Sequence, residues 1–218
     1  ADPAHWQGSD GIPIRVAEHI ALSGLSVAVA AAIALPIGAY IGHTGHGAFI
    51  AVSVANIGRA IPSLALLAFA LPISIALGLG LGFWPTFMAL VPLAIPPILT
   101  NTYAGIRAAD ADTVEAARGM GMREWQILNA VEVPAALPIV LAGVRTASVN
   151  VIATATLGAI VAGPALGRYI VDGFALQDFE RLFVGALLVA ILALGTEAGF
   201  GLLERMSRHT RLAAAGEP

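Results

Sequence analysis

The sequence predicts an all-α, polytopic membrane protein: a bundle of about five transmembrane helices. Three observations lead to this prediction. Hydrophobic residues make up 58% of the 218 residues and charged residues only 11%, whereas a soluble domain of this length needs far more charge to cover its surface. Several charge-free runs reach about 20 residues, the length at which a helix spans the hydrocarbon core of a bilayer. The period-2 alternation that a membrane barrel needs is not visible.

Each long apolar run predicts one transmembrane helix, because lipid supplies no water to exposed backbone N–H and C=O groups. The stretch between Ala60 and Ile106 carries no charged side chain and is too long for a single span. The segment GLGLGFWP at 78–85 divides it into two helices. The predicted spans are residues 20–41, 60 (or earlier) to 77, 84–106, 134–162 and 182–203.

Five spans place the two termini on opposite sides of the membrane, and cytoplasmic loops carry an excess of basic residues. Six arginines share the side of the central loop and the C-terminus: Arg107, Arg118, Arg123, Arg205, Arg208 and Arg211. Three share the other side: Arg15, Arg168 and Arg181. Arg59 would join the larger group if residues 47–58 lie along the cytoplasmic interface. We therefore expect the N-terminus outside and the C-terminus in the cytoplasm.

No internal repeat or second folded domain is apparent, so we expect a single transmembrane domain over residues 1–218. Three parts would lie outside the spans. They are an external segment at 1–17, which lacks the basic region of a signal peptide, a cytoplasmic loop at 107–133, and a cytoplasmic tail at 204–218.

Composition excludes several kinds of site. All eleven basic residues are arginine, so the chain lacks the lysine of a Walker-type ATP site, and any ATP must be bound by another subunit. Cysteine is absent and the net charge is −3, which excludes thiolate metal sites and offers no basic field for nucleic acid. His43 and His46 lie three residues apart in a short loop without a third ligand, which favours a solvated loop over a metal site. No catalytic constellation is visible, so we expect no enzymatic activity.

The central loop shows the signals of a short helix. Asp110 and Asp112 precede Thr113, so they provide an N-cap and negative charge at the positive end of a helix. Val114, Ala117 and Met120 then fall on one face. Glycines at 119 and 121 weaken the helix within two turns.

A second short helix is predicted at 123–131, with Trp125 and Leu128 as apolar anchors and Ile127 as a further candidate. Pro134 is expected to end this helix and to begin the next span. Two short helices that expose an apolar face with a tryptophan suit docking into a groove of a partner protein.

The same loop resembles the EAA loop of the membrane subunits of binding-protein-dependent ABC importers, a methionine-importer-like family. Glu115, Ala116, Ala117, Gly121 and Pro134 stand in the register of that motif, while valines at 131 and 133 replace the usual Ile and Leu. The resemblance implies a coupling helix that sits in a cleft of an ATPase subunit, with ATP and Mg bound there and no cofactor in this chain. The residues expected to dock are Glu115, Ala116, Ala117, Gly121, Trp125 and Leu128.

Three segments, 58–73, 96–106 and 150–173, resemble the five-helix permeases for osmoprotectants such as glycine betaine, choline and carnitine. Pro164 and Ala165 depart from the Gly-Gly pair usual in that branch. The resemblance implies an ATPase dimer, a second permease copy or homologue, an extracytoplasmic binding protein, and a place in the plasma or inner membrane of a prokaryote, in contact with lipid.

Polar residues inside the predicted spans are candidates for function. Charge within a bilayer is costly and usually faces a bundle interior, so Arg145 either lines a path or pairs with Glu197 of the last span. Asn101, Asn150 and Thr154 are candidates for a translocation path, although such side chains often hydrogen-bond between helices instead.

Quaternary ammonium groups are normally bound by aromatic cages. The three tryptophans, Trp6, Trp84 and Trp125, do not cluster mid-membrane, and Trp84 fits an interfacial anchor. High-affinity capture is therefore expected in the separate binding protein.

Other functions stay open from the sequence. An ABC permease for another small solute, such as an amino acid, would show the same loop. An ion-coupled secondary carrier often shows inverted repeats and membrane-buried acids, but here Glu197 is the one acid within a predicted span. A membrane-embedded enzyme would need a catalytic constellation. Retention of an ATPase subunit during purification would distinguish the importer from the carrier.

Overall fold

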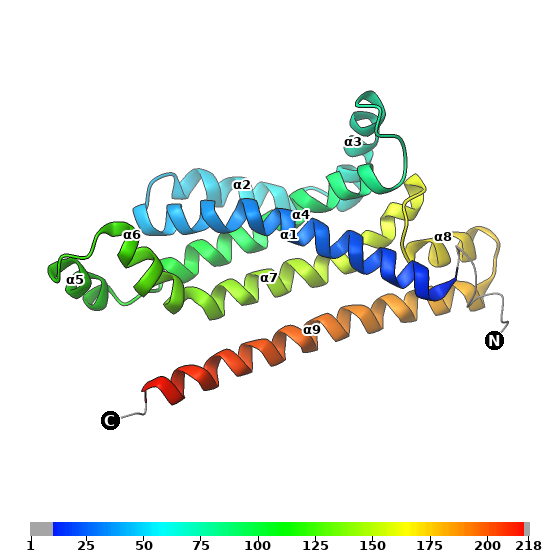
Figure 1. Ribbon diagram of the computed structural model, residues 1–218. Helices are drawn as coiled ribbons and strands as arrows, with labels where there is room; N and C mark the ends of the chain where they lie inside the picture. Colours follow the sequence, from blue (N-terminus) through cyan, green and yellow to red (C-terminus); the bar gives the residue numbers. More distant parts are fainter. Residues whose placement is uncertain (1–10, 216–218) are drawn as a thin grey trace.

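The computed structural model describes the backbone of residues 11–215 and their side chains except those of residues 50, 54, 59 and 205–215. The regular elements are α1 (Ile12–Thr44), α2 (Ala48–Ala60), α3 (Ser63–Ala76), α4 (Phe83–Arg107), α5 (Ala111–Gly119), α6 (Glu124–Ile127), the π-helical segment η2 (Leu128–Glu132), α7 (Val133–Ala155), the 3₁₀ segment η3 (Thr156–Val161), α8 (Gly167–Ala175) and α9 (Phe179–Ala215). Every regular element in this range is helical, which confirms the predicted all-α class (Figure 1).

The core of the bundle lies between α1, α4 and α7. Its fully buried side chains include Leu22 of α1, Ile98 of α4 and Val151 of α7. Small residues let the helices approach closely: a Cβ added at Gly38 would lie 2.8 Å from Cβ of Thr102. Close packing of this kind drives helix association in membranes, where burial of apolar surface contributes little. The long helix α9 is attached to this core through α7 and α8 (Figure 1).

Four helical segments are long and apolar enough to cross a membrane: Ile12–Thr44, Phe83–Arg107, Glu124–Val161 and Phe179–Glu204. The predicted number of five is reached if α2 and α3 form one broken span, since they meet at a bend of 96°. The bend follows from Pro62, which cannot donate a backbone hydrogen bond and disfavours a helical conformation of the residue before it.

The predicted break at Pro134 was wrong. Helical structure runs from Glu124 through η2 into α7 without interruption, and this stretch forms one candidate span with η3. Proline removes an N–H and its ring crowds the carbonyl of the fourth residue before it. The wider π-helical turn immediately before Pro134 accommodates both effects, so the helix continues.

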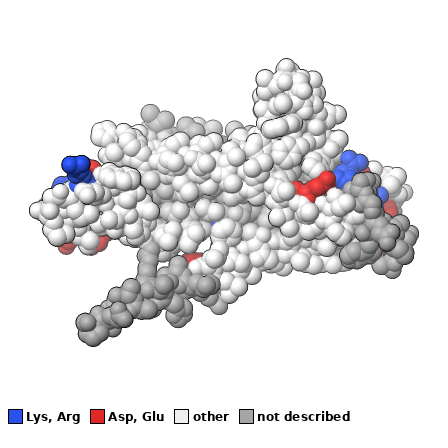
Figure 2. All heavy atoms as spheres, in the orientation of Figure 1, with Lys and Arg blue, Asp and Glu red and all other residues white. Residues whose placement is uncertain are grey.

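Charged side chains gather at the two ends of the bundle, and few appear in the middle of the visible face (Figure 2). Arg107, Arg118 and Arg123 belong to the end that carries α5 and α6, whereas Arg168 and Arg181 belong to the opposite end, with α8 and the start of α1 (Figure 1). Some expectations fall outside the described residues: Trp6 in segment 1–10, and the side chains of Arg59, Arg205, Arg208 and Arg211.

Candidate functional site

The predicted start of the loop helix is confirmed by its cap. The Asp110 carboxylate accepts hydrogen bonds from the backbone N–H and the hydroxyl of Thr113, both at 2.8 Å. These two bonds hold the pKa of Asp110 below its ordinary value. The cap satisfies one of the N–H groups that a helix leaves without an internal partner, and therefore defines where α5 begins.

The glycine of the EAA motif sits in the turn between α5 and α6. Gly121 adopts φ = +82°, a left-handed conformation that costs a side-chain-bearing residue free energy. A Cβ there would meet no atom within 4 Å. Glycine is therefore favoured at position 121 by the backbone conformation of the turn and not by lack of space. That conformation sets the angle at which α6 follows α5.

The two short helices expose part of the predicted docking set. Glu115 and Ala116 are exposed on α5, and Trp125 is 70% exposed on α6. Met120, predicted to share a helix face with Ala117, is exposed as well, whereas Ala117 is not.

Other members of the predicted docking set face the chain itself. Ala117 is 2% exposed and Ile127 is completely buried, which corrects the expectation that they are presented to a partner. Leu128 is half-buried in η2. These buried side chains hold the loop against the rest of the chain.

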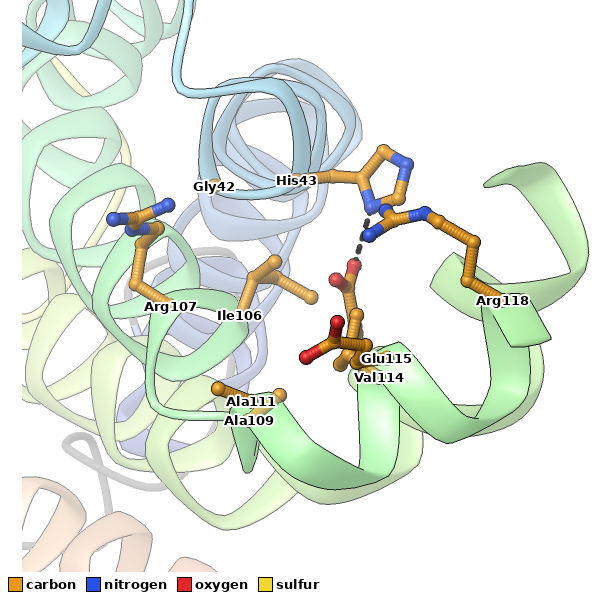
Figure 3. A pocket seen from close by; sticks show the side chains of 10 residues that line it. Gly42, His43, Ile106, Arg107, Ala109, Ala111, Val114, Glu115 and Arg118 are labelled. Carbon is orange, nitrogen blue, oxygen red and sulfur yellow. Dashed lines mark hydrogen bonds and ion pairs between the residues drawn. The ribbon is translucent and has the colours of Figure 1, made fainter. Parts of the chain in front are cut away.

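A polar cavity of about 540 Å³ lies beneath α5, lined by Gly42, His43, Ile106, Arg107, Ala109, Ala111, Val114, Glu115, Arg118 and Glu132 (Figure 3). Within it, His43 Nδ1 lies 2.6 Å from a carboxylate oxygen of Glu132, and Nε2 lies 3.3 Å from Glu124. The expectation that His43 occupies a solvated loop was wrong, because α1 continues to Thr44 and brings the ring over Glu132. His46 does lie exposed beyond the helix end.

Arg118 connects α5 to α6 at the rim of this cavity. Its guanidinium donates to both carboxylate oxygens of Glu124, at 2.8 and 2.9 Å. This paired geometry is the stronger form of an Arg–carboxylate contact, and it raises the pKa of Arg118. Among the described residues, no group of three or more His, Cys, Asp or Glu side chains could hold a metal ion.

The structure places Arg145 of α7 against α9, where its guanidinium contacts the Glu197 carboxylate. Glu204, one further acid on the same helix, lies 3.4 Å from Arg145. Glu204 was not predicted as a partner of Arg145, because it falls at the start of the predicted tail. Its spacing of seven residues from Glu197 puts both acids on one face of α9, and this spacing could have predicted the second contact.

The three candidate path residues lie in different surroundings. Asn101 donates to the carbonyl of Pro97 at 2.7 Å and packs against Gly143 of α7, where an added Cβ would lie 2.6 Å from its own Cβ. Thr154 is half-buried, and Asn150 is exposed on α7. Asn150 shares a face with Thr146 and Ala153, which are exposed as well.

The aromatic side chains at the start of α4 pack on one another. The rings of Phe83 and Phe87 stack at 5.7 Å, and Trp84 meets both edge-on at 5.4 and 6.2 Å. Rings in mutual contact leave no room for an ammonium group between them. This cluster is therefore not an aromatic cage, and Trp84 stays a predicted anchor.

The Pro164–Ala165 departure has a conformational consequence. Ala165 is 1% exposed and adopts φ = +135°, a region in which glycine is strongly favoured. The glycine usual at this position would relieve that strain.

A buried polar pair was also missed. His19 is completely buried and donates from Nε2 to the carbonyl of Ile152 at 2.9 Å, and Ser23 lies one turn further along α1.

The family described as "Binding-protein-dependent transport system inner membrane component" matches residues 30–209. The glycine betaine/carnitine/choline transport system permease protein of Bacillus subtilis is 36% identical, over 88% of this chain and 86% of that protein. An osmoprotectant import permease protein of Salmonella typhimurium is 35% identical, over 88% of this chain and 80% of that protein. A structure of the MetNI methionine ABC transporter in an inward facing conformation has a TM-score of 0.80, covering 95% of this chain and 99% of that chain at 21% identity. This last likeness shows the fold alone.

Proposed function

This chain belongs to the family of binding-protein-dependent transport system inner membrane components, and we propose that it is the permease subunit of an ATP-driven importer for quaternary-amine osmoprotectants. The observation that carries the substrate class is the similarity, along nearly its whole length, to relatives named for glycine betaine, carnitine and choline transport. As a multi-pass inner-membrane component, it would provide the passage while partner subunits supply energy and capture.

The exposed loop surface supports docking of an ATPase subunit. Glu115, Ala116, Met120 and Trp125 are all exposed at one end of the bundle, and a large exposed tryptophan is typical of a binding hot spot. Since the chain has no lysine for a phosphate-binding loop, ATP and Mg would be bound by a dimer of ATPase subunits. Closure of that dimer would move the loop and switch the bundle between inward-open and outward-open states.

The exposed face of α7 supports a second permease copy or homologue. Thr146, Asn150 and Ala153 form a small, partly polar stripe on the membrane-spanning part of the helix. Polar groups facing lipid are costly, so we expect this stripe, with Thr154 beside it, to line a passage between two subunits. The aromatic rings at the start of α4 pack on one another and form no cage, which favours capture of the ammonium group by an extracytoplasmic binding protein.

The loop 107–133 and the C-terminus would then face the cytoplasm, with the N-terminus outside. The end opposite this loop carries three arginines, Arg15, Arg168 and Arg181. The end with α5 and α6 also carries three, and the far end of α9, with Arg205, Arg208 and Arg211 in its sequence, lies at this same end and adds three more (Figure 1). This distribution supports the orientation through the excess of basic residues on the cytoplasmic side.

Reconstitution into liposomes tests the proposal. The chain would be produced with its ATPase subunits and binding protein, and uptake of glycine betaine, choline and carnitine measured with and without ATP. We expect uptake of at least one of the three to require both ATP and the binding protein. Uptake driven by a proton gradient with this chain alone would instead identify an ion-coupled carrier, and ATP-driven uptake of amino acids only would overturn the substrate class.

Two matched variants test the docking surface. Trp125→Ala removes an exposed aromatic side chain from the loop, whereas Phe174→Ala removes an equally exposed one from α8 at the opposite end. We expect Trp125→Ala to lower the amount of ATPase that co-purifies by about tenfold, because anchors of this kind dominate interface energies. Phe174→Ala should leave retention unchanged. Equal retention in both variants would contradict docking at this loop.

A further inference from the structure

The imidazole of His43 lies between two carboxylates from different segments. Nδ1 is 2.6 Å from the Glu132 carboxylate and Nε2 is 3.3 Å from that of Glu124. The ring and Glu132 are largely shielded, with side chains only 11% and 9% exposed, whereas Glu124 is 57% exposed. The contact therefore has a buried inner half and a solvated outer half.

The Nδ1 contact is a hydrogen bond, in which the ring donates to the Glu132 carboxylate. The Nε2 contact with Glu124 is the longer of the two. His43 stands in the last turn of α1, so both contacts are made from the end of that helix. Arg118, Arg107 and Glu115 are the other charged groups that line this cavity (Figure 3).

The ring is held at a fixed place because the end of α1 is packed closely on α4. A Cβ added at Gly42 would lie 2.6 Å from Cβ of Ile106 and 3.2 Å from the carbonyl oxygen of Tyr103. No side chain larger than hydrogen fits at position 42 without a shift of one helix. His43 therefore moves with the α1–α4 pair.

The two carboxylates belong to the parts that an ATPase would move. Glu132 ends η2 and leads directly into α7, while Glu124 begins α6 and accepts both hydrogen bonds from Arg118 of α5. The order of contacts is thus α5 to α6 through Arg118 and Glu124, α6 to α1 through Glu124 and His43, and α1 to α7 through His43 and Glu132.

From this connectivity we propose that His43 is a positioning residue for coupling: its ring, held between Glu132 and Glu124, makes α1 move together with α5 and the continuous α6–α7 helix. The inference rests on the proposed function, since the motion it transmits is that of the ATPase-docking loop. Without the ring, α1 and the loop move more independently of each other. ATP hydrolysis then continues while less substrate is carried for each ATP.

The test compares three variants in the reconstituted complex with its ATPase subunits and binding protein. His43→Gln removes the imidazole ring, His43→Lys provides an ammonium group that can reach Glu132, and His46→Gln changes an exposed histidine three residues away. We expect His43→Gln to lower the ratio of substrate transported to ATP hydrolysed by about fivefold, a size usual for residues that transmit coupling. His43→Lys should recover most of the ratio, and His46→Gln should equal the unaltered complex.

A normal ratio in His43→Gln would overturn the inference while leaving the proposed function intact. If that variant does not fold, Glu124→Gln decides, because it leaves the buried contact with Glu132 in place and weakens the contacts of Glu124 with His43 and Arg118. We expect it to lower the ratio by about twofold, and an unchanged ratio would overturn the inference. Absence of ATP-driven uptake by the unaltered complex would instead overturn the proposed function.

A second readout does not depend on transport. Amide hydrogen exchange of residues 111–127 can be followed in the full chain in nanodiscs. We expect His43→Gln to accelerate exchange there about tenfold, as for a segment that has lost its attachment to the bundle. His46→Gln should have no effect. Unchanged exchange in His43→Gln would overturn the proposal, whatever the complex transports.

Discussion

Two groups of charged side chains connect elements of this bundle, and they differ in whether water can reach them. The span cluster joins Arg145 of α7 to Glu197 and Glu204 of α9. The loop cluster consists of His43, Glu132, Glu124 and Arg118 and lies at one end of the molecule. The side chains of His43 and Glu132 are largely buried, whereas those of Glu124 and Arg118 are exposed. A charge left without its partner is costly where water is excluded and cheap where water replaces the partner. The loss of stability on breaking a contact should therefore be larger where water has less access to the charges.

The two clusters also differ in what they hold together. The span cluster attaches α9, whose apolar side chains such as Phe183 and Leu194 are largely exposed, to a single neighbouring helix. The loop cluster joins three segments of the chain at the place where a partner is proposed to push. The first contact is therefore expected to matter for assembly of the bundle, and the second for transmission of movement.

The largest effect is expected for Arg145→Ala. This change removes the partner of Glu197 on a membrane-spanning helix, and intramembrane carboxylates are strongly disfavoured. We expect the yield of folded, monodisperse protein to fall on the order of tenfold, measured by size-exclusion chromatography in mild detergent. The double variant Arg145→Ala/Glu197→Gln should recover much of the yield. No recovery would argue against the pairing of Arg145 with Glu197 as the cause.

The next effect is expected for Glu132→Gln, which breaks the buried half of the loop cluster. Gln keeps an acceptor for His43 but removes the negative charge, so a charge-assisted hydrogen bond becomes a neutral one. We expect a loss of about 1–2 kcal/mol in the free energy of unfolding, measured by denaturant titration in micelles. In a double-mutant cycle with His43→Gln, the two losses should not add. Simple additivity would show that the two side chains do not interact.

The span cluster and the loop cluster were not equally predictable. Arg145 and Glu197 stand almost alone in apolar sequence, so each is nearly the only possible partner of the other. His43 and Glu132 are 89 positions apart, and the loop near Glu132 offers several other carboxylates. Choosing the right one requires knowing how the end of α1 packs on the start of α7. That packing depends on close contacts such as Gly42 with Ile106, which leave no pattern in the sequence.

Features that depend only on residues close together in the sequence were predicted correctly. The cap at Asp110 involves residues three apart, and the membrane spans depend on composition over about 20 residues. Pro134 shows the opposite case. Its local signal is a helix break, but the π-helical segment before it keeps the helix continuous. Such a segment is a property of the folded chain and is not visible in residue types.

A smaller effect is expected for Arg118→Ala, in the exposed half of the loop cluster. Arg118 and Glu124 are both more than half exposed, so water replaces each partner when the other is removed. We expect thermal stability close to that of the unaltered chain. The remaining difference should shrink as salt is raised from about 0.05 to 0.5 M, because exposed ion pairs are screened. A difference that persists at high salt would place the pair in a less solvated environment than the structure shows.

The smallest effect is expected at Asp110, whose fully solvated carboxylate caps α5. Asp110→Ala should accelerate amide exchange at the start of α5 a few-fold near neutral pH, since one N–H group loses its acceptor. Asp110→Asn is the matched control and should behave nearly as the unaltered chain, because its side-chain oxygen still accepts. The pKa of Asp110 is lowered by its bonds to Thr113, so the charge contribution is present above the ordinary carboxyl value of about 3.9 and is lost as the pH falls through the lower folded-state value. The small difference in exchange rate between Asp110→Asn and the unaltered chain should therefore vanish in strong acid. A difference that grows with acidity would contradict the capping role of the carboxylate.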